Sequence, residues 1–216
     1  MQVYVITGME YDSNIYLVTG KVPTIIDTGT GFHSRTVLQK IHLYIQPLTI
    51  RQIILTHEHF DHVGGVPELL KAAQGNADII AQKAVVQKLK EGKSTFAEML
   101  GGTMPSITVD MPVSDNERIT IGDDSFLVLA TPGHSIGSLC LYGEKSRSLF
   151  SGDTVFAHGG FGRYDFPGGN LETLHHSIER LAALEVDNLY PGHGPFVEHQ
   201  GKDHILKALR NIQSLV

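Results

Sequence analysis

The chain has 216 residues, with 17 Lys or Arg against 23 Asp or Glu, so its formal charge at pH 7 is −6. A hydrophobic fraction of 41% and a charged fraction of 19% exclude a disordered or fibrous protein, and the length favours a single domain over residues 1–216. The acidic balance argues against a nucleic-acid surface, because phosphate binding needs clustered basic side chains.

The first half of the chain predicts alternating strands and helices. Runs rich in Val, Ile, Thr and Tyr predict strands, and a nearly all-apolar run at 52–56 predicts a strand covered on both faces. Apolar residues at helical spacing predict a helix that Ser34 caps and Pro47 ends. The expected strands are 3–7, 14–18, 23–27, 52–56 and 78–81, and the expected helices are 34–45, 66–74 and 84–90.

The second half again predicts strands and helices, after a segment with weak periodicity. Residues 92–112 carry several breakers, so we expect a long surface connection there. Strands are expected at 118–121, 125–130, 138–142, 148–151 and 188–190, with a helix capped by Asn170 and a last helix capped by Asp203. Each half runs from strands to helix to strand and helix. We therefore expect an α/β protein, a four-layer α/β/β/α sandwich with helices outside two sheets.

The sharpest local feature is the segment THEHFDH at residues 56–62, directly after the expected buried strand. In an extended or turn conformation, positions 57 and 59 point the same way and position 58 points away. His57 and His59 can therefore share one cation, and Asp61 with His62 can reach a second one.

Three more possible ligands follow expected strands. His134, Asp153 and His193 each stand beside glycine, where a backbone can turn tightly and present a side chain to a cleft. The chain has twelve histidines but one cysteine, Cys140, so any metal must be held by imidazole and carboxylate. That donor set suits zinc, iron or manganese, and it excludes a thiolate-held structural zinc.

The HxHxDH motif followed by a His, an Asp and a His in this order resembles the metallo-β-lactamase superfamily over essentially the whole chain. Within it, DSNIYLV at 12–18, IIDTG at 25–29 and GRYDFPGG at 162–169 are similar to glyoxalase II-like hydrolases, also called hydroxyacylglutathione hydrolases. The last stretch is typical of a short, single-domain branch, although related persulfide dioxygenases carry a similar one. The resemblance implies a sandwich of the metallo-β-lactamase type.

The resemblance also implies a dinuclear centre with zinc as the first expectation and iron or manganese as alternatives. One metal would be held by His57, His59 and His134, and the other by Asp61, His62 and His193, with Asp153 bridging. A water shared by two cations has its pKa lowered toward about 7, so the expected nucleophile is a metal-bridging hydroxide. Asp61 and Asp153 are then the catalytic carboxylates. Asp27 either orients a ligand imidazole or caps a turn.

Substrate contacts are expected from Arg163 and Tyr164, since glyoxalase II enzymes place a cationic residue near this point toward a glutathione carboxylate. The alternative is that Arg163 pairs with Asp165 and only fixes the loop. The chain ends 23 residues after His193, so we expect no C-terminal helical domain for glutathione. His158, close in sequence to Asp153, is a further candidate for lining the cleft.

The leading prediction is a hydrolase of S-2-hydroxyacyl thioesters. A mononuclear iron persulfide dioxygenase, which would need only His57, His134 and Asp153, is the first alternative, and a lactonase or β-lactamase is the second. An RNA-processing nuclease is disfavoured by the −6 charge. The expected partner is a small-molecule thioester, with neither nucleic acid nor membrane, and the oligomeric state stays open. The N-terminus lacks a signal-peptide pattern, so the expected location is cytoplasmic.

Overall fold

Two β-sheets organise the chain. The structure, a computed structural model, describes residues 2–93 and 96–216. One unit comprises Met1–Val113 with Thr120–Asp123, and the other comprises Ser114–Ile119 with Asp124–Val216. Among the described residues, no helix is long and apolar enough to cross a membrane.

The strands of the first unit are β1 (Gln2–Ile6), β2 (Ile15–Thr19), β3 (Thr24–Ile26), β4 (Gln52–Ile54), β5 (Asp78–Gln82) and β6 (Met111–Val113). They lie in this order in one sheet, antiparallel from β1 to β3 and parallel from β3 to β6. β3, β4 and β5 each carry two consecutive isoleucines that are buried, as expected for strands covered on both faces.

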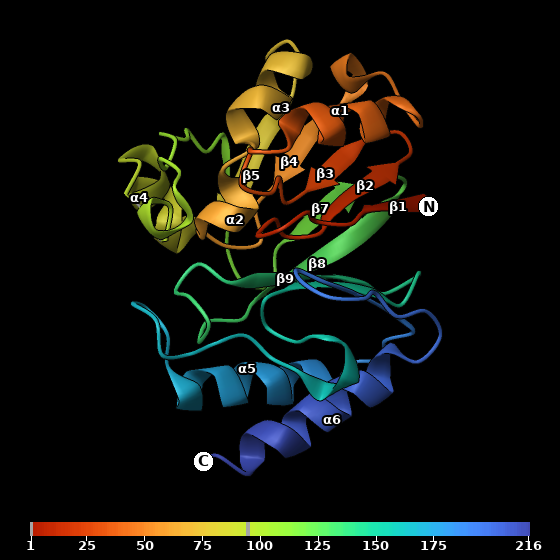
Figure 1. Cartoon of the computed structure of the whole chain (residues 1–216). Helices are drawn as coiled ribbons and strands as arrows, with labels where there is room; N and C mark the ends of the chain where they lie inside the picture. Colours follow the sequence, from red (N-terminus) through yellow and green to blue (C-terminus); the bar gives the residue numbers. More distant parts are fainter. Residues whose placement is uncertain (1, 94–95) are drawn as a thin grey trace. The chain divides into compact units, whose positions relative to one another are not determined.

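The first unit also contains α1 (Ser34–His42), α2 (Phe60–Val63), α3 (Val66–Ala72) and α4 (Val86–Lys90), with short 3-10 helices η1 (Pro47–Thr49), η2 (Lys83–Val85) and η3 (Glu98–Leu100). Figure 1 shows α1 and α3 on the same side of this sheet. Val37 and Ile41 of α1 and Leu69 of α3 join Ile25 and Ile53 of the strands in one apolar cluster. The helices are therefore held to the sheet by burial of their apolar faces.

The second sheet has the order β11-β10-β9-β8-β7, formed by β7 (Arg118–Ile121), β8 (Asp124–Ala130), β9 (Leu139–Gly143), β10 (Ser148–Gly152) and β11 (Asn188–Pro191). Helices α5 (Leu171–Ala182) and α6 (Gly201–Gln213) lie side by side (Figure 1), and the short η4 (Ala157–Gly159) follows β10. Leu174 and Ile178 of α5 and Ile205 of α6 pack with Leu149 and Leu189 of the sheet.

The ends of neighbouring strands bring distant segments together. β3 and β4 are parallel with Ile26 opposite Ile54, so the residues that follow both strands emerge at the same edge. β10 and β11 are likewise parallel, with Gly152 opposite Pro191. Both sheets therefore place polar loops at the carboxyl ends of parallel strands, the usual location of sites in α/β proteins.

Most expected elements are present within one to three residues of their predicted bounds, but the structure corrects four details. Ser34 does not cap α1, because its hydroxyl donates to Gly31 O instead of accepting from the helix. α1 ends at His42, five residues before Pro47, which instead begins η1. Asp203 does not cap the last helix, which begins two residues earlier without a side-chain cap.

The fourth correction concerns residues 92–112, of which 94 and 95 lie outside the described residues. Most described residues of this segment are exposed or half-buried, as a surface connection predicts, but parts of it belong to the core and to the sheet. Met104 and Ile107 are buried in the core of the first unit, and Met111 pairs with Ile80 as β6 joins the sheet. β6 has only three residues, too few to show an alternating pattern in the sequence, and its partner β5 lies about thirty residues earlier.

Candidate metal centre

The HxHxDH motif folds as an extended segment that turns into one helical turn. His59 is extended, with φ −73° and ψ 145°, and α2 begins at the next residue. The ring centroid of His57 lies 4.6 Å from that of His59 and 4.0 Å from that of His62, and all three side chains are buried. The motif thus gathers three imidazoles in the first unit.

Glu58 points away from these rings, as the alternation predicts. Its carboxylate is fully buried and forms an ion pair with Lys88 of α4, with an N–O distance of 3.1 Å. Glu58 therefore attaches the motif to α4, while His57 and His59 on either side of it carry the imidazoles.

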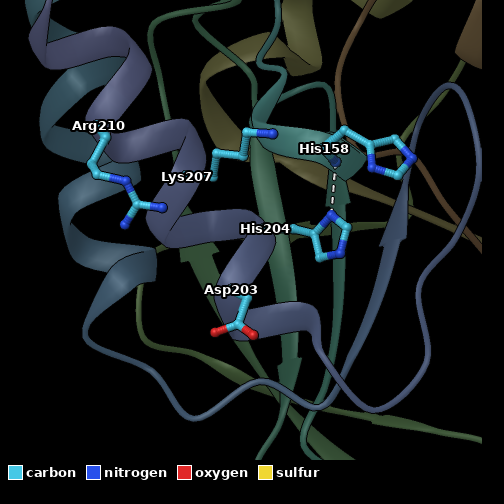
Figure 2. Close-up of a pocket in the computed structure, with 5 residues that line it drawn as sticks. All are labelled: His158, Asp203, His204, Lys207 and Arg210. Carbon is cyan, nitrogen blue, oxygen red and sulfur yellow. Dashed lines mark hydrogen bonds between the residues drawn. The ribbon is translucent and has the colours of Figure 1, made fainter.

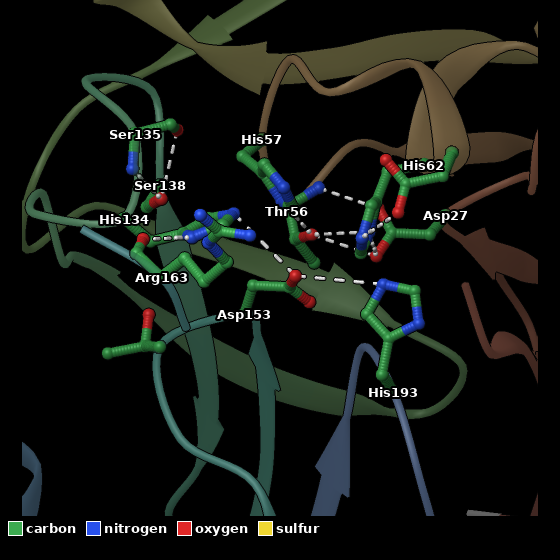
Figure 3. Close-up of polar contacts among 12 residues, drawn as sticks. Asp27, Thr56, His57, His62, His134, Ser135, Ser138, Asp153, Arg163 and His193 are labelled. Carbon is green, nitrogen blue, oxygen red and sulfur yellow. Dashed lines mark hydrogen bonds and ion pairs between the residues drawn. The ribbon is translucent and has the colours of Figure 1, made fainter. Parts of the chain in front are cut away.

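Asp27 follows β3 and orients His62. Its Oδ2 lies 2.8 Å from His62 Nδ1 and accepts a hydrogen bond from Thr56 Oγ1 at 2.8 Å, while Oδ1 accepts from Thr56 N at 2.8 Å (Figure 3). A carboxylate that already accepts these bonds places the imidazole proton on Nδ1, so Nε2 of His62 carries the lone pair. Of the two roles considered for Asp27, the structure contains both: it contacts the imidazole and it ties β3 to the turn after β4.

Asp61 lies beside the other nitrogen of His62. Its Oδ2 is 3.6 Å from His62 Nε2, and its side chain is 19% exposed. That separation is too long for a hydrogen bond. It is near the spacing of two atoms bound to the same ion, about 3.4 Å for a tetrahedral site with bonds of about 2.1 Å.

The second unit repeats this geometry around Asp153, which follows β10. Its Oδ2 lies 3.6 Å from His134 Nε2 and also 3.6 Å from His193 Nε2 (Figure 3). The rings of Phe156 and His193 lie nearly perpendicular to each other, with centroids 6.3 Å apart. One carboxylate oxygen therefore faces two imidazole nitrogens that come from the loops after β8 and β11.

The tautomer of His134 is set by the main chain. Its Nδ1 lies 2.7 Å from the carbonyl oxygen of Arg163, which can only accept, so Nδ1 bears the hydrogen and Nε2 bears the lone pair. Gly162 makes this approach possible: a Cβ there would lie 2.0 Å from Asp153 O and 2.7 Å from His134 Nδ1. The glycine-rich stretch at 162–169 thus supports the imidazole from behind.

The side chains gathered in each unit are of the types that ligate divalent cations. His134 turns a lone-pair nitrogen toward a carboxylate oxygen 3.6 Å away with no proton between them, which would be unfavourable without a positive charge there. Imidazole and carboxylate without thiolate are the donors of zinc, iron and manganese sites, and each imidazole with a partner behind it is already oriented. The first unit holds His57, His59, Asp61 and His62, and the second holds His134, Asp153 and His193.

The predicted substrate residues have other contacts. The Arg163 guanidinium is bound to Asp165 by two hydrogen bonds of 2.9 and 2.7 Å and lies 4.1 Å from the centre of the Phe166 ring. Tyr164 packs against the apolar core of the second unit. The part of Arg163 that reaches a predicted ligand is its carbonyl oxygen. The loop-fixing pair with Asp165 is therefore present, and the side-chain role toward substrate stays a prediction.

Sequence reasoning missed one supporting network, although it singled out the stretches that contain it. Asp12 accepts hydrogen bonds from Thr30 N and Thr30 Oγ1, and its Oδ2 lies 3.0 Å from His33 Nδ1. The next residue, Ser13, donates its N–H to Asp61 O at 3.0 Å, and Thr28 Oγ1 donates to His62 O at 2.9 Å. The residues after β3 and before β2 therefore hold the main chain of α2.

Comparison with known proteins identifies the family. A sequence profile described as the metallo-beta-lactamase superfamily matches residues 8–193. The "Probable metallo-hydrolase MJ0888" of Methanocaldococcus jannaschii is 33% identical over 195 residues, which cover 88% of this chain and 91% of that protein.

Two solved structures extend the comparison to the fold. TTHA1623, described in a di-iron-bound form, is 30% identical with a TM-score of 0.75 over 97% of both chains. The BLEG-1 B3 metallo-beta-lactamase is 25% identical with a TM-score of 0.79 over 100% of both chains. The chain belongs to the metallo-β-lactamase superfamily and has its fold, which confirms the fold class expected from the sequence.

Proposed function

We propose that this chain is a metal-dependent hydrolase that cleaves S-2-hydroxyacyl thioesters, like the glyoxalase II enzymes its short motifs resemble. In this proposal the two clusters of donors bind two divalent ions. One ion takes His57, His59 and His134, the other takes Asp61, His62 and His193, and Asp153 is shared. Zinc is the first candidate metal, and iron is supported by the di-iron form of TTHA1623.

The observation that carries the proposal is the position of Asp153 between two imidazoles. A single Oδ2 lies 3.6 Å from both His134 Nε2 and His193 Nε2, and a carboxylate can donate to two ions at once. Asp at this position favours hydrolases of thioesters, lactones and phosphodiesters. A cysteine would point to thiolate-bearing β-lactamases. Names such as "Probable metallo-hydrolase" among the relatives support the broader class.

When bound, two such ions would polarise a thioester carbonyl and make water at the site more acidic. The chain's own residues then have defined tasks. Asp27 and the carbonyl of Arg163 hold His62 and His134 in the tautomers that ligate through Nε2. The partly exposed carboxylate of Asp61 is placed to accept a proton from water. A thiol product, with a pKa near 8.5, needs no dedicated acid from the protein.

Arg163 remains the candidate for a substrate carboxylate. Its guanidinium is exposed and already bound to a carboxylate, Asp165, so a substrate would have to exchange with that partner. Ion pairs at exposed positions contribute little to stability because water screens them, so a substrate carboxylate could replace Asp165 at small cost. Tyr164 is half-buried against the core, so in this proposal only its hydroxyl would contact the substrate.

The test combines metal analysis with turnover. Protein purified without added metal should contain up to two divalent ions per chain and hydrolyse S-lactoylglutathione or another 2-hydroxyacyl thioester faster than acyl-homoserine lactones or a cephalosporin. The variant Asp153→Ala should lose metal and turnover while keeping its circular dichroism spectrum. Asp187→Ala, which removes a carboxylate paired with Arg147 at 3.9 Å, is the control and should keep both.

Other outcomes would replace the proposal. One iron per chain together with oxygen uptake in the presence of a persulfide would identify a persulfide dioxygenase. Faster cleavage of lactones than of thioesters would identify a lactonase. Full turnover by Asp153→Ala would contradict the shared-ligand role.

A further inference from the structure

A polar pocket lies in the second unit, where η4 meets α6. It has a volume of about 290 Å³ and is lined by His158, Asp203, His204, Lys207 and Arg210 (Figure 2). This volume is at the small end of the range for small-molecule sites. His158, expected from the sequence to line the metal-site cleft, lines this pocket.

Helical spacing explains why α6 contributes four of these residues. Asp203, Lys207 and Arg210 stand at positions i, i+4 and i+7, which share one face of a helix, and His204 adjoins that face. η4 is held against this helix by Asn211 Nδ2, which donates to Gly159 O at 2.8 Å. The pocket therefore lies between two elements, η4 and α6, that pack against each other.

The main chain of η4 fixes the tautomer of His204. The backbone N–H of His158 donates to His204 Nδ1 at 2.7 Å, shown as the dashed line in Figure 2. With Nδ1 occupied as an acceptor, the ring hydrogen is on Nε2, so His204 offers an N–H and no lone pair. His158 holds this contact from a left-handed conformation, with φ 60° and ψ 16°, which is uncommon for a residue with a side chain.

The two cations of the pocket have no acidic partner in the part of the chain that the structure describes. Among the described residues, no carboxylate lies within 4.0 Å of Lys207 Nζ or the Arg210 guanidinium. Asp203 has the i, i+4 spacing to pair with Lys207, yet Figure 2 shows its carboxylate directed away from that ammonium group. Burial lowers the pKa of His204, and the positive field of His158 and Lys207 lowers it further, against the opposing effect of Asp203.

We propose that this pocket binds a phosphate group, either free or carried by a small ester. An ammonium, a guanidinium and an imidazole N–H are three kinds of donor that match the terminal oxygens of a phosphate, and its double negative charge matches two unpaired cations. A metal cation does not fit the same lining, because among the described residues His158, Asp203 and His204 do not form a group of three donor atoms within 4.8 Å of one another, and His204 presents an N–H. The volume exceeds that of a phosphate alone, so a small organic group also fits.

The test measures phosphate binding to the metal-loaded full chain by calorimetry and by the NMR signals of His204 and the His158 amide. Inorganic phosphate and phenyl phosphate are the probes: tighter binding of phenyl phosphate would indicate an ester, and equal binding would indicate free phosphate. We expect saturable binding that shifts both signals. Each of Lys207→Gln and Arg210→Gln should weaken it about tenfold, the loss of one charge-assisted contact.

The double variant Lys40→Gln/Lys71→Gln is the control, because it removes the same charge as Lys207→Gln/Arg210→Gln from helices α1 and α3. It should bind phosphate like the parent protein. None of the four substituted residues is buried, and unchanged thermal unfolding midpoints would verify that the variants fold. Phosphate binding that is equally strong without Lys207 and Arg210 would overturn the proposal, as would the absence of any shift at His204. The first of these results would assign phosphate to the metal centre.

Discussion

Substituting Asp27 by Asn tests whether a hydrogen bond behind an imidazole controls the metal centre. The carboxylate is 1% exposed and receives three contacts of 2.8 Å, from Thr56 N, Thr56 Oγ1 and His62 Nδ1. The amide has the same shape but only one acceptor atom, so its NH₂ group must face either Thr56 N or His62 Nδ1. In the second case His62 would accept at Nδ1 and carry its hydrogen on Nε2, which removes a ligand.

The magnitude follows from these contacts. Where the NH₂ group faces Thr56 N, a hydrogen bond to a buried charge is lost and two donors are forced together, which should reduce the free energy of unfolding by about 2–4 kcal/mol. Loss of the carboxylate behind a ligating imidazole should weaken metal binding about 10–100-fold. Urea unfolding of the metal-free protein measures the first effect, and metal titration against a chromophoric chelator measures the second.

Asp12→Asn is a closely matched control. Asp12 is also buried and also contacts a threonine N–H, a threonine hydroxyl and a histidine Nδ1, namely Thr30 and His33. His33 is not a predicted ligand and Asp12 reaches α2 only through the neighbouring main chain, so Asp12→Asn should lose similar stability but clearly less metal affinity than Asp27→Asn. If both variants lose metal equally, the effect of Asp27 on the centre is only general destabilisation and the reasoning is refuted.

Two further predictions concern the second unit. Gly162→Ala should weaken metal binding about 10–100-fold, because its Cβ would lie 2.0 Å from Asp153 O and 2.7 Å from His134 Nδ1 and so separate that ring from Arg163 O. Gly160→Ala is the control and should bind metal normally, because the nearest atom to its Cβ is 3.3 Å away. Equal metal affinities of the two variants would contradict this prediction. Burial raises the pKa of the Cys140 thiol from 9.0 to about 11, so its contribution to stability is present below pH 9 and is lost as the pH rises toward 11. Urea unfolding at several pH values should show that, between pH 9 and 11, the free energy of unfolding falls by up to about 2–3 kcal/mol more in the parent protein than in Cys140→Ala. Parallel pH profiles of the two proteins would exclude this contribution of the thiol.

Both clusters of donors depend on the same feature of the fold. Asp27 and the HxHxDH motif follow the parallel strands β3 and β4, and Asp153 and His193 follow the parallel strands β10 and β11. The hydrogen bond from Asp27 N to Ile54 O, at 2.9 Å, and that from Gly192 N to Gly152 O, at 2.8 Å, extend the pairing past the strand ends. The loops are thus rigid at their bases, as ligand positions require.

Residue type and spacing alone determined a large part of this description. The alternation at 57, 58 and 59 predicted that Glu58 points away from its neighbours, and it pairs with Lys88. Asn170 was predicted to cap α5, and its Oδ1 accepts from Thr173 N at 2.8 Å. These features depend on positions within four residues of each other, where backbone periodicity decides the direction of a side chain.

Only the tertiary structure decided which atom of each residue makes the contact that matters at the site. Asp27 and His62 are 35 residues apart, and Arg163 reaches His134 through its carbonyl while its side chain binds Asp165. The pocket on α6 also needed the fold, because His158 meets His204 across 46 residues. A sequence names the donors a residue can offer, but the direction of each donor and its partner depend on long-range packing, which local patterns do not encode.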